Sequence, residues 1–129
     1  MPSYTDSLRG YASKILARDG YRCRYCGLDG TASFSNWLAL SEDHLLPKGH
    51  PNRNKEEFRV ASCQFCNAAD NRYLEKAVAR GDSFEGLTSE ALVALRMVVV
   101  QKTRDEFRRY WEQNIAPRSK EGARSPVDL

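Results

Sequence analysis

Hydrophobic residues recur at helical spacing near the start of the chain. In residues 5–19, four apolar side chains fall on one face of a helix: Leu8, Ala12, Ile15 and Leu16. Gly20 is a suitable C-terminal stop, because glycine reaches the left-handed backbone conformation without strain. The pattern predicts an N-terminal helix over residues 5–19.

The middle of the chain alternates short apolar runs with turn-rich segments. WLALS (residues 37–41) predicts a short strand that leads into the segment around His44, and FRVAS (58–62) predicts a second extended segment. The stretch between them, PKGHPNRNK (47–55), has the Pro, Gly and Asn content of a loop.

Two helices are predicted in the second half. One covers about residues 66–80 and ends at Gly81. The other runs from an N-cap at Thr88 to about Gln113. Its helical period places Leu92, Leu95, Val99 and Phe107 inward and Arg104, Arg108 and Arg109 outward. From residue 116 onward, Pro, Ser and charged residues predict a loose tail.

Length and charge fit one small domain. The chain has 129 residues, of which 41% are hydrophobic, and a net charge of +3 from 20 Lys+Arg against 17 Asp+Glu. This charge permits nucleic acid as a partner, although a solvated surface of mixed charge fits equally well. The first ten residues contain no apolar run like that of a signal peptide, and ALVALRMVVV is too short to span a membrane. We expect a cytoplasmic protein without membrane contact.

The four cysteines form two CxxC pairs. They are Cys23, Cys26, Cys63 and Cys66. In a reducing compartment two disulfides are not expected, and paired CxxC units are the usual way to hold zinc between four thiolates. Redox chemistry and bystander thiols are the alternatives, but a redox site needs only one CxxC in a βαβ context.

Both histidines, His44 and His50, lie between the cysteine pairs in SEDHLLPKGHPN. Asp43 directly precedes His44, while Asn67 and Asn71 lie four residues apart on one face of the predicted helix. If zinc joins the two pairs, Asp43, His44 and the asparagine oxygens can converge. A carboxylate with amide oxygens suits a hard cation such as Mg²⁺, and a neighbouring histidine suits a general base.

Three motifs in register carry a resemblance to a known family. YRCRYCG, EDHLLPKGHPN and ASCQFCNAADN together resemble the HNH endonucleases in their four-cysteine form, over roughly residues 18–72. The asparagine directly after the last cysteine is similar to the phage-type junction-resolving endonucleases. The resemblance implies an α+β fold: a zinc-stapled ββα-metal, treble-clef-like core, here with flanking N-terminal and long C-terminal helices. We expect a single nuclease domain over residues 1–115, followed by the tail over 116–129.

The resemblance also implies roles at matching positions. His44 matches the general base, and Asp43 and Asn67 match ligands of a catalytic Mg²⁺ or Mn²⁺, with Asn71 as an additional ligand. The four cysteines match the structural zinc ligands. The implied activity is hydrolysis of DNA phosphodiester bonds to 5′-phosphate and 3′-hydroxyl ends, in a prokaryotic or phage context.

One position departs from the family pattern. Phe58 stands five residues before the third cysteine, where the family usually has asparagine. That residue orients the base through its main-chain carbonyl, which Phe58 keeps, but its side-chain hydrogen bond is lost. Asn52 or Asn54 can brace the loop instead. His50 has no matching role, and contact with phosphate, participation in the metal site and a solvated loop position all stay open.

Four basic residues near the motif are candidate phosphate contacts: Lys48, Arg53, Lys55 and Arg72. An ordinary solvated surface explains them as well. The rival to a nuclease is a zinc-stapled module that binds DNA without cutting, which the departure at Phe58 favours. A third possibility is a protein-interaction domain: Val98, Val99 and Val100 cannot all face one core, so the C-terminal helix can form a homodimer.

Overall fold

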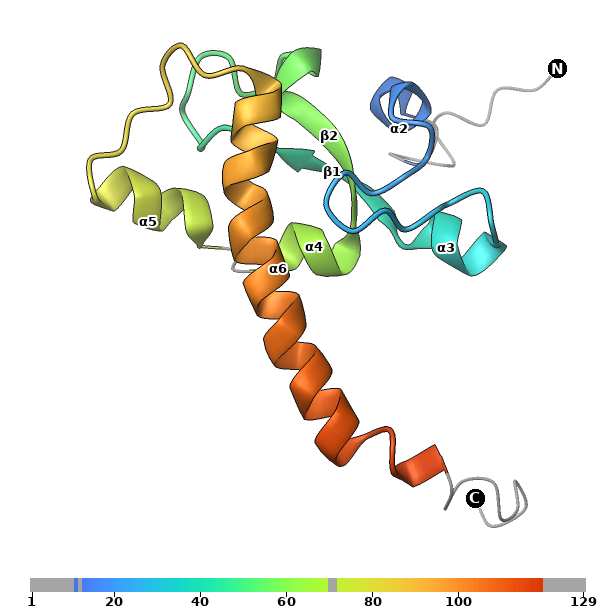
Figure 1. Cartoon of the computed structure of the whole chain (residues 1–129). Coiled ribbons are helices and arrows are strands. Elements are labelled where there is room, and N and C mark those ends of the chain that lie inside the picture. The colour runs from blue at the N-terminus through green and yellow to red at the C-terminus, as the bar shows by residue number, and fades with distance from the viewer. Residues whose placement is uncertain (1–10, 12, 70–71, 120–129) are drawn as a thin grey trace, which may run out of the picture.

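The computed structural model describes residue 11 and residues 13–69 and 72–119. In chain order the elements are α2 (Lys14–Arg18), α3 (Phe34–Leu38), β1 (Leu40–His44), the 3₁₀ helix η2 (Glu56–Phe58), β2 (Arg59–Cys63), α4 (Gln64–Ala68), α5 (Tyr73–Ala79) and α6 (Ser89–Asn114) (Figure 1). Helices and one small sheet share the chain, which confirms the predicted α+β class.

The sheet consists of β1 and β2, paired antiparallel. The register places Leu40 opposite Cys63 and His44 opposite Arg59. β2 passes directly into α4, because Cys63 is both the last strand residue and the N-cap of the helix. The two strands and this helix therefore form one continuous unit that contains the third and fourth cysteines.

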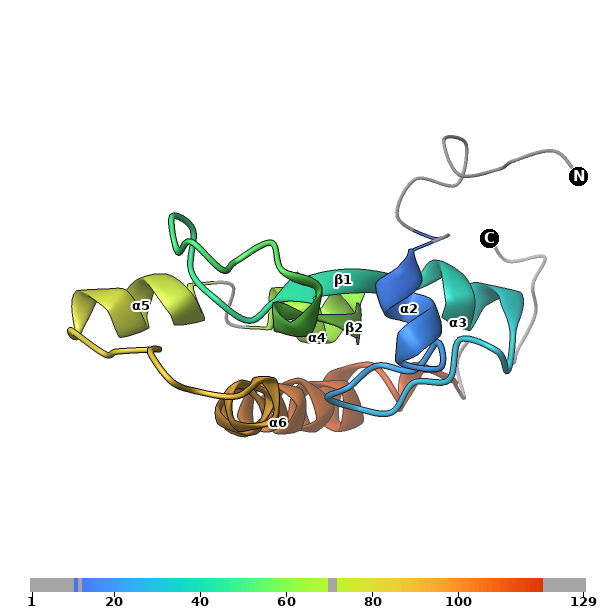
Figure 2. The ribbon, with the colours of Figure 1, turned by 90° about the horizontal axis from the view of Figure 1, so that it is seen from above.

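The two faces of the sheet pack against different helices. Val60 belongs to the larger core cluster, together with Leu92 and Val93 of α6. The next residue, Ala61, points to the other face and packs with Leu16 of α2 and with Leu40. Viewed from above, α6 forms a layer beneath the one that contains the sheet, α4 and α5 (Figure 2).

The outer edge of β2 is bonded to the segment that follows α2. The Asp19 carboxylate accepts a hydrogen bond of 2.8 Å from the Ala61 N–H. The Ala61 carbonyl accepts one of 2.9 Å from the Arg24 N–H. Both main-chain groups of a fully buried residue are thus satisfied, as a buried backbone requires.

Helix α6 begins where the sequence predicts. The Thr88 hydroxyl accepts a hydrogen bond of 3.1 Å from the Ala91 N–H and caps the helix. Its buried residues, Leu92, Val93, Arg96 and Val100, all lie in the first half, and the end of the second half extends away from the body (Figure 1). The inward orientation predicted for Leu95 is wrong, since it is 49% exposed. Phe107 faces Phe65 of α4 but stays 60% exposed, so it is not part of the core.

Three other boundaries differ from the prediction. Trp37 and Leu38 lie in α3 rather than in a strand, because the Ser33 side chain accepts from the Asn36 N–H and starts a helix. The first helix starts at Lys14, after an extended Ser13, and the predicted residues 5–10 lie outside the described part. The predicted helix over 66–80 is interrupted, since Ala69 is extended. The end of the predicted tail, residues 120–129, is also not described.

No helix in the described part of the chain is long and apolar enough to cross a membrane. Helix α6 has the length, but charged residues recur along it.

Candidate functional site

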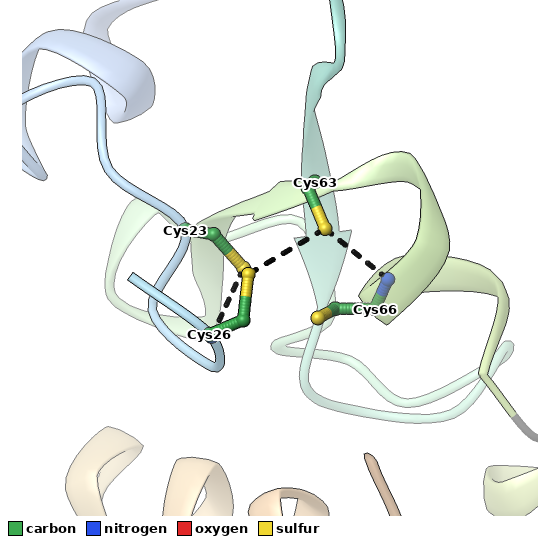
Figure 3. A group of neighbouring side chains, drawn as sticks. All are labelled: Cys23, Cys26, Cys63 and Cys66. Carbon is green, nitrogen blue, oxygen red and sulfur yellow. Dashed lines mark hydrogen bonds between the residues drawn. The ribbon is translucent and has the colours of Figure 1, made fainter. Parts of the chain in front are cut away.

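The four cysteines meet at one point. Their Sγ atoms all lie within 4.8 Å of one another, and the Cys26 and Cys63 sulfurs are 3.8 Å apart. Cys23 and Cys26 come from the loop after α2, and Cys63 and Cys66 from the junction of β2 and α4 (Figure 3). Sulfurs bound to one zinc ion at about 2.3 Å lie about 3.8 Å apart in a tetrahedron, and none of these cysteines is in a disulfide. The cluster can hold a structural metal such as zinc.

Local hydrogen bonds shape both cysteine loops. The Cys26 N–H donates to the Cys23 sulfur at 3.5 Å, and the Cys66 N–H donates to the Cys63 sulfur at 3.4 Å. The first loop closes through the Gly27 N–H, 2.9 Å from the Cys23 carbonyl. Gly27 has a φ of 77°, which glycine adopts freely. Each CxxC is thus a tight turn that aims both of its sulfurs in one direction.

The thiols of Cys23, Cys63 and Cys66 shift one another's pKa through their hydrogen bonds. Hydrogen bonds from Cys63 and Cys66 lower the pKa of Cys23. The hydrogen bond with Cys23 raises the pKa of Cys63 to about 11, and that of Cys66 is raised as well. A single thiolate is stabilised while further negative charge is opposed. A divalent cation at the centre removes this conflict, so the donor set fits a metal ion.

A second candidate site is a cavity next to the cysteine cluster, lined by residues of β1, α4 and α6. Asp43, His44 and Asn67 line one cavity of about 210 Å³. The end of β1 carries Asp43 and His44, and α4 carries Asn67, so the fold brings together residues that lie up to 24 positions apart along the chain. Tyr25, Arg53 and Arg96 add polar groups to the cavity wall. Four of the predicted site residues, Asp43, His44, Asn67 and Arg53, therefore share one pocket.

Asp43 is a buried carboxylate. Asp43 is only 8% exposed, and its Oδ2 accepts a hydrogen bond of 2.6 Å from the Tyr25 hydroxyl. Burial raises the pKa of Asp43, while the Tyr25 hydrogen bond and the charge of Arg96 oppose the rise. A buried carboxylate is stabilised by a cation, and hard divalent ions prefer such oxygen ligands.

Asn67 is held against β1 through its amide nitrogen. Nδ2 donates to the Ser41 Oγ at 3.0 Å and to the Glu42 carbonyl at 3.1 Å. Because both amide hydrogens are directed at the strand, the oxygen is the atom left to bind a ligand. The side chain is thereby oriented by the neighbour of Asp43.

His44 is half-buried at the end of β1. Burial lowers its pKa from 6.5, the charges of Arg53 and Arg59 lower it further, and Glu42 and a hydrogen bond with Asn54 act in the opposite direction. The imidazole is therefore neutral at pH 7, which is the form that can accept a proton. Asn54 is one of the two residues expected to brace this loop.

Arg96 is a site residue that the sequence analysis did not identify. It is 8% exposed, and its guanidinium donates to the Asn67 carbonyl at 3.1 Å and more weakly to the Cys66 carbonyl at 3.4 Å. The side chain also lies over the Tyr73 ring, 5.3 Å from its centre. One signal was present: Arg96 is the only charge within the run ALVALRMVVV, and a lone charge on a buried helix face needs polar partners.

The predicted DNA-contacting residues do not all lie equally close to the cavity. Arg53 lines it, and together with Lys48 it also lines a neighbouring groove along α5. Lys55 is exposed, and Arg72 is exposed and paired with Glu75 at 3.3 Å.

The remaining predicted residues have structural roles or lie outside the description. The His50 Nδ1 accepts a hydrogen bond of 3.1 Å from the Asn52 N–H, within its own loop. The Phe58 carbonyl accepts one of 2.9 Å from the Leu45 N–H, so its proposed role in orienting His44 stays a prediction. Asn71 lies outside the described residues.

Comparisons of the chain with protein-family models, with curated proteins and with solved structures gave no significant match.

Proposed function

We propose that this protein is a metal-dependent DNA endonuclease of the HNH type. The observation that carries the proposal is the shared cavity of Asp43, His44 and Asn67, placed directly beside the four-cysteine cluster. The order of motifs along the chain supports it, because the resemblance to HNH endonucleases rests on the same residues.

The arrangement of β1, β2 and α4 supports a ββα-metal core. Two antiparallel strands lead into a short helix, and Asp43 on a strand faces the same cavity as Asn67 on the helix. In this scheme the cysteine cluster holds zinc and braces the junction of β2 and α4. The zinc has no part in the reaction.

The cavity residues would divide the chemistry among them. The Asp43 carboxylate and the Asn67 oxygen would hold Mg²⁺ or Mn²⁺, which supplies positive charge to the phosphate and the leaving oxygen. His44, neutral at pH 7, would take a proton from the attacking water. Arg53 would contact a phosphate beside the scissile bond, since it lines the cavity. Cleavage at the 3′ oxygen would leave 5′-phosphate and 3′-hydroxyl ends.

Plasmid cleavage tests the proposal. We expect purified protein to nick or linearise supercoiled plasmid or long mixed-sequence DNA in Mg²⁺ or Mn²⁺, and to leave it intact in EDTA. His44→Ala should abolish cleavage, whereas His50→Ala should retain it. His50 is a matched control because it lies in the loop that follows β1, six residues after His44, but does not line the cavity.

Product ends and DNA binding separate the proposal from its rival. Products with 3′-phosphate ends would contradict the mechanism. If wild type and His44→Ala leave all DNA intact yet bind it equally, the protein is a non-cutting DNA-binding module.

A further inference from the structure

The exposed half of α6 carries aromatic side chains that the proposed cleavage site does not use. Phe107, Tyr110 and Trp111 are 60%, 63% and 51% exposed. Such large side chains are seldom left in solvent together without a function. Phe107 and Trp111 continue the helix face on which Val100 is fully buried, seven and eleven residues further on.

A groove of about 290 Å³ runs between this half of α6 and the start of α4. Its wall consists of Phe65, Arg104, Phe107, Arg108 and Trp111. The Phe65 and Phe107 rings meet edge to face with their centres 5.0 Å apart. The Arg104 guanidinium lies over the Phe65 ring, 5.4 Å from its centre.

The aromatic rings and guanidinium groups that line the groove favour an anionic ligand with flat, stackable rings. Two guanidinium groups line the groove, and none of the described residues in its wall is acidic. Aromatic rings beside arginines form the usual platform for nucleobases, which stack on the rings while phosphates contact the charges. We propose that this groove binds unpaired bases of a nucleic acid strand.

A second copy of the chain fits the groove less well. A symmetric contact would bring Arg104 and Arg108 of both copies together, and like charges at an interface disfavour association. An acidic peptide satisfies the charges but not the three aromatic faces. The choice of nucleic acid also rests on the proposed function, because α4 and α6 line both the groove and the Asp43 cavity.

The distance between the two sites suits one bound strand. From Arg96, at the cavity, to Arg104 and Trp111 the helix rises about 12 Å and 22 Å at 1.5 Å per residue. These distances correspond to about four to seven base pairs at 3.4 Å each. A substrate with an unpaired segment at this distance from the cleaved bond would engage both sites.

Binding of a twelve-nucleotide oligothymidylate tests the proposal in the full-length protein without added Mg²⁺. The matched probe is an abasic oligomer of the same length, which has the same charge but no bases. We expect Trp111→Ala and Phe107→Ala to weaken oligothymidylate binding about tenfold or more, since each stacked base contributes substantially. Tyr110→Ala is the control, because Tyr110 is equally exposed on the same helix but does not line the groove. Circular dichroism verifies that each variant is folded.

Tryptophan fluorescence gives a second readout. The chain contains Trp37 and Trp111, so a Trp37→Phe background leaves Trp111 as the single reporter. Quenching by oligothymidylate but not by the abasic oligomer supports stacking.

Four results would overturn the proposal, and the first three concern the oligothymidylate assay and the oligomeric state. These three are equal binding of both probes, Trp111→Ala binding like wild type, and a wild-type dimer in sedimentation that Trp111→Ala converts to a monomer. Oligoglutamate that binds as tightly with the same dependence on Trp111 also overturns it. Plasmid cleavage, which depends on His44, is measured separately. A loss of cleavage is therefore distinguishable from a loss of oligothymidylate binding.

Discussion

The Tyr25 hydroxyl donates a hydrogen bond of 2.6 Å to the Asp43 carboxylate. Tyr25 lies within the first CxxC pair, so the loop that presents two sulfurs to the four-cysteine cluster also positions a residue of the neighbouring cavity. Burial and the charge of Asp43 both raise the pKa of Tyr25, which therefore stays a hydrogen-bond donor at neutral pH. The two sites are linked through this one side chain.

Replacement of Tyr25 should weaken both folding and cation binding. In Tyr25→Phe the buried Asp43 carboxylate loses its donor, and hydrogen bonds to charged groups contribute about 1.5–3 kcal/mol. We expect a comparable fall in the free energy of unfolding in urea at pH 7. Mn²⁺ affinity, measured by electron paramagnetic resonance, should fall about tenfold or more, as is typical when a group that orients a metal ligand is removed.

Tyr110→Phe is the control for this substitution. Tyr110 is 63% exposed, and loss of its hydroxyl should change stability by less than about 0.5 kcal/mol. Equal stability of Tyr25→Phe and wild type would show that the hydrogen bond does not support Asp43.

The cysteine cluster should bind one zinc ion per chain. Elemental analysis of the purified protein should find zinc in stoichiometric amount, and Cys66→Ala should lose it, because the cluster then has three sulfurs. A strong chelator should unfold wild type, since structural zinc contributes about 10–16 kcal/mol of apparent binding free energy in small zinc-dependent folds.

Cys26→His tests whether coordination, rather than the thiol itself, is needed. Three cysteines and one histidine are a common zinc ligand set, and Cys26 is the only partly exposed residue of the four. This variant should retain zinc where Cys26→Ser loses it. A native protein free of zinc in the reduced state would contradict the assignment.

The pKa of His44 should lie below 6.5. Burial lowers it first and the charge of Arg53 lowers it next. The neutral imidazole therefore persists to lower pH, and the acid limb of the cleavage rate should also lie below 6.5. An NMR titration of the ring protons measures the value, and Arg53→Ala should raise it. A midpoint above 6.5 in wild type would contradict the expectation.

Asp19 should stabilise the fold in a pH-dependent manner. Burial alone would raise its pKa, but hydrogen bonds from Arg18 and the Ala61 N–H outweigh this effect and lower it below 3.8. The stabilisation is therefore complete above pH 3.8 and is lost as the pH falls through the lower folded value. Asp19→Ala should cost about 1–3 kcal/mol at pH 6, because the Ala61 N–H is left buried without a partner.

Urea unfolding at pH 6 and near pH 3 measures this effect. The difference between wild type and Asp19→Ala should shrink at the lower pH. Asp82→Ala is the control, since Asp82 forms only an exposed ion pair with Arg80, and such pairs contribute little.

The sequence predicted correctly those helix boundaries that depend on a capping residue or a glycine nearby in the chain. Thr88 caps α6, and Gly81, at a φ of 81°, ends α5 as expected. The four cysteines were expected to meet, and they do; each CxxC turn forms through its own short-range hydrogen bonds. The convergence of Asp43, His44 and Asn67 was expected if the two cysteine pairs meet, and these three residues line one cavity.

Predictions were wrong where tertiary contacts decide. The spacing of Phe107 correctly indicates an apolar helix face. The local sequence does not show, however, that α6 extends beyond the other elements, which leaves Phe107 largely exposed. Similarly, the helix that begins at Gln64 ends at Ala68. The Arg96 guanidinium, from the distant helix α6, donates hydrogen bonds to its Cys66 and Asn67 carbonyls. Trp37 lies in α3 rather than in the predicted strand, because the Ser33 hydroxyl caps a helix that begins three residues before it.

The bonding of Ala61 on the outer edge of β2 has a consequence for solubility. An unpaired strand edge is a template on which another chain can add a strand, and a two-stranded sheet has proportionally much edge. At Ala61, Asp19 and Arg24 already occupy the N–H and the carbonyl. A foreign strand would have to displace both before it could pair there, so this edge is protected against the intermolecular pairing that begins aggregation.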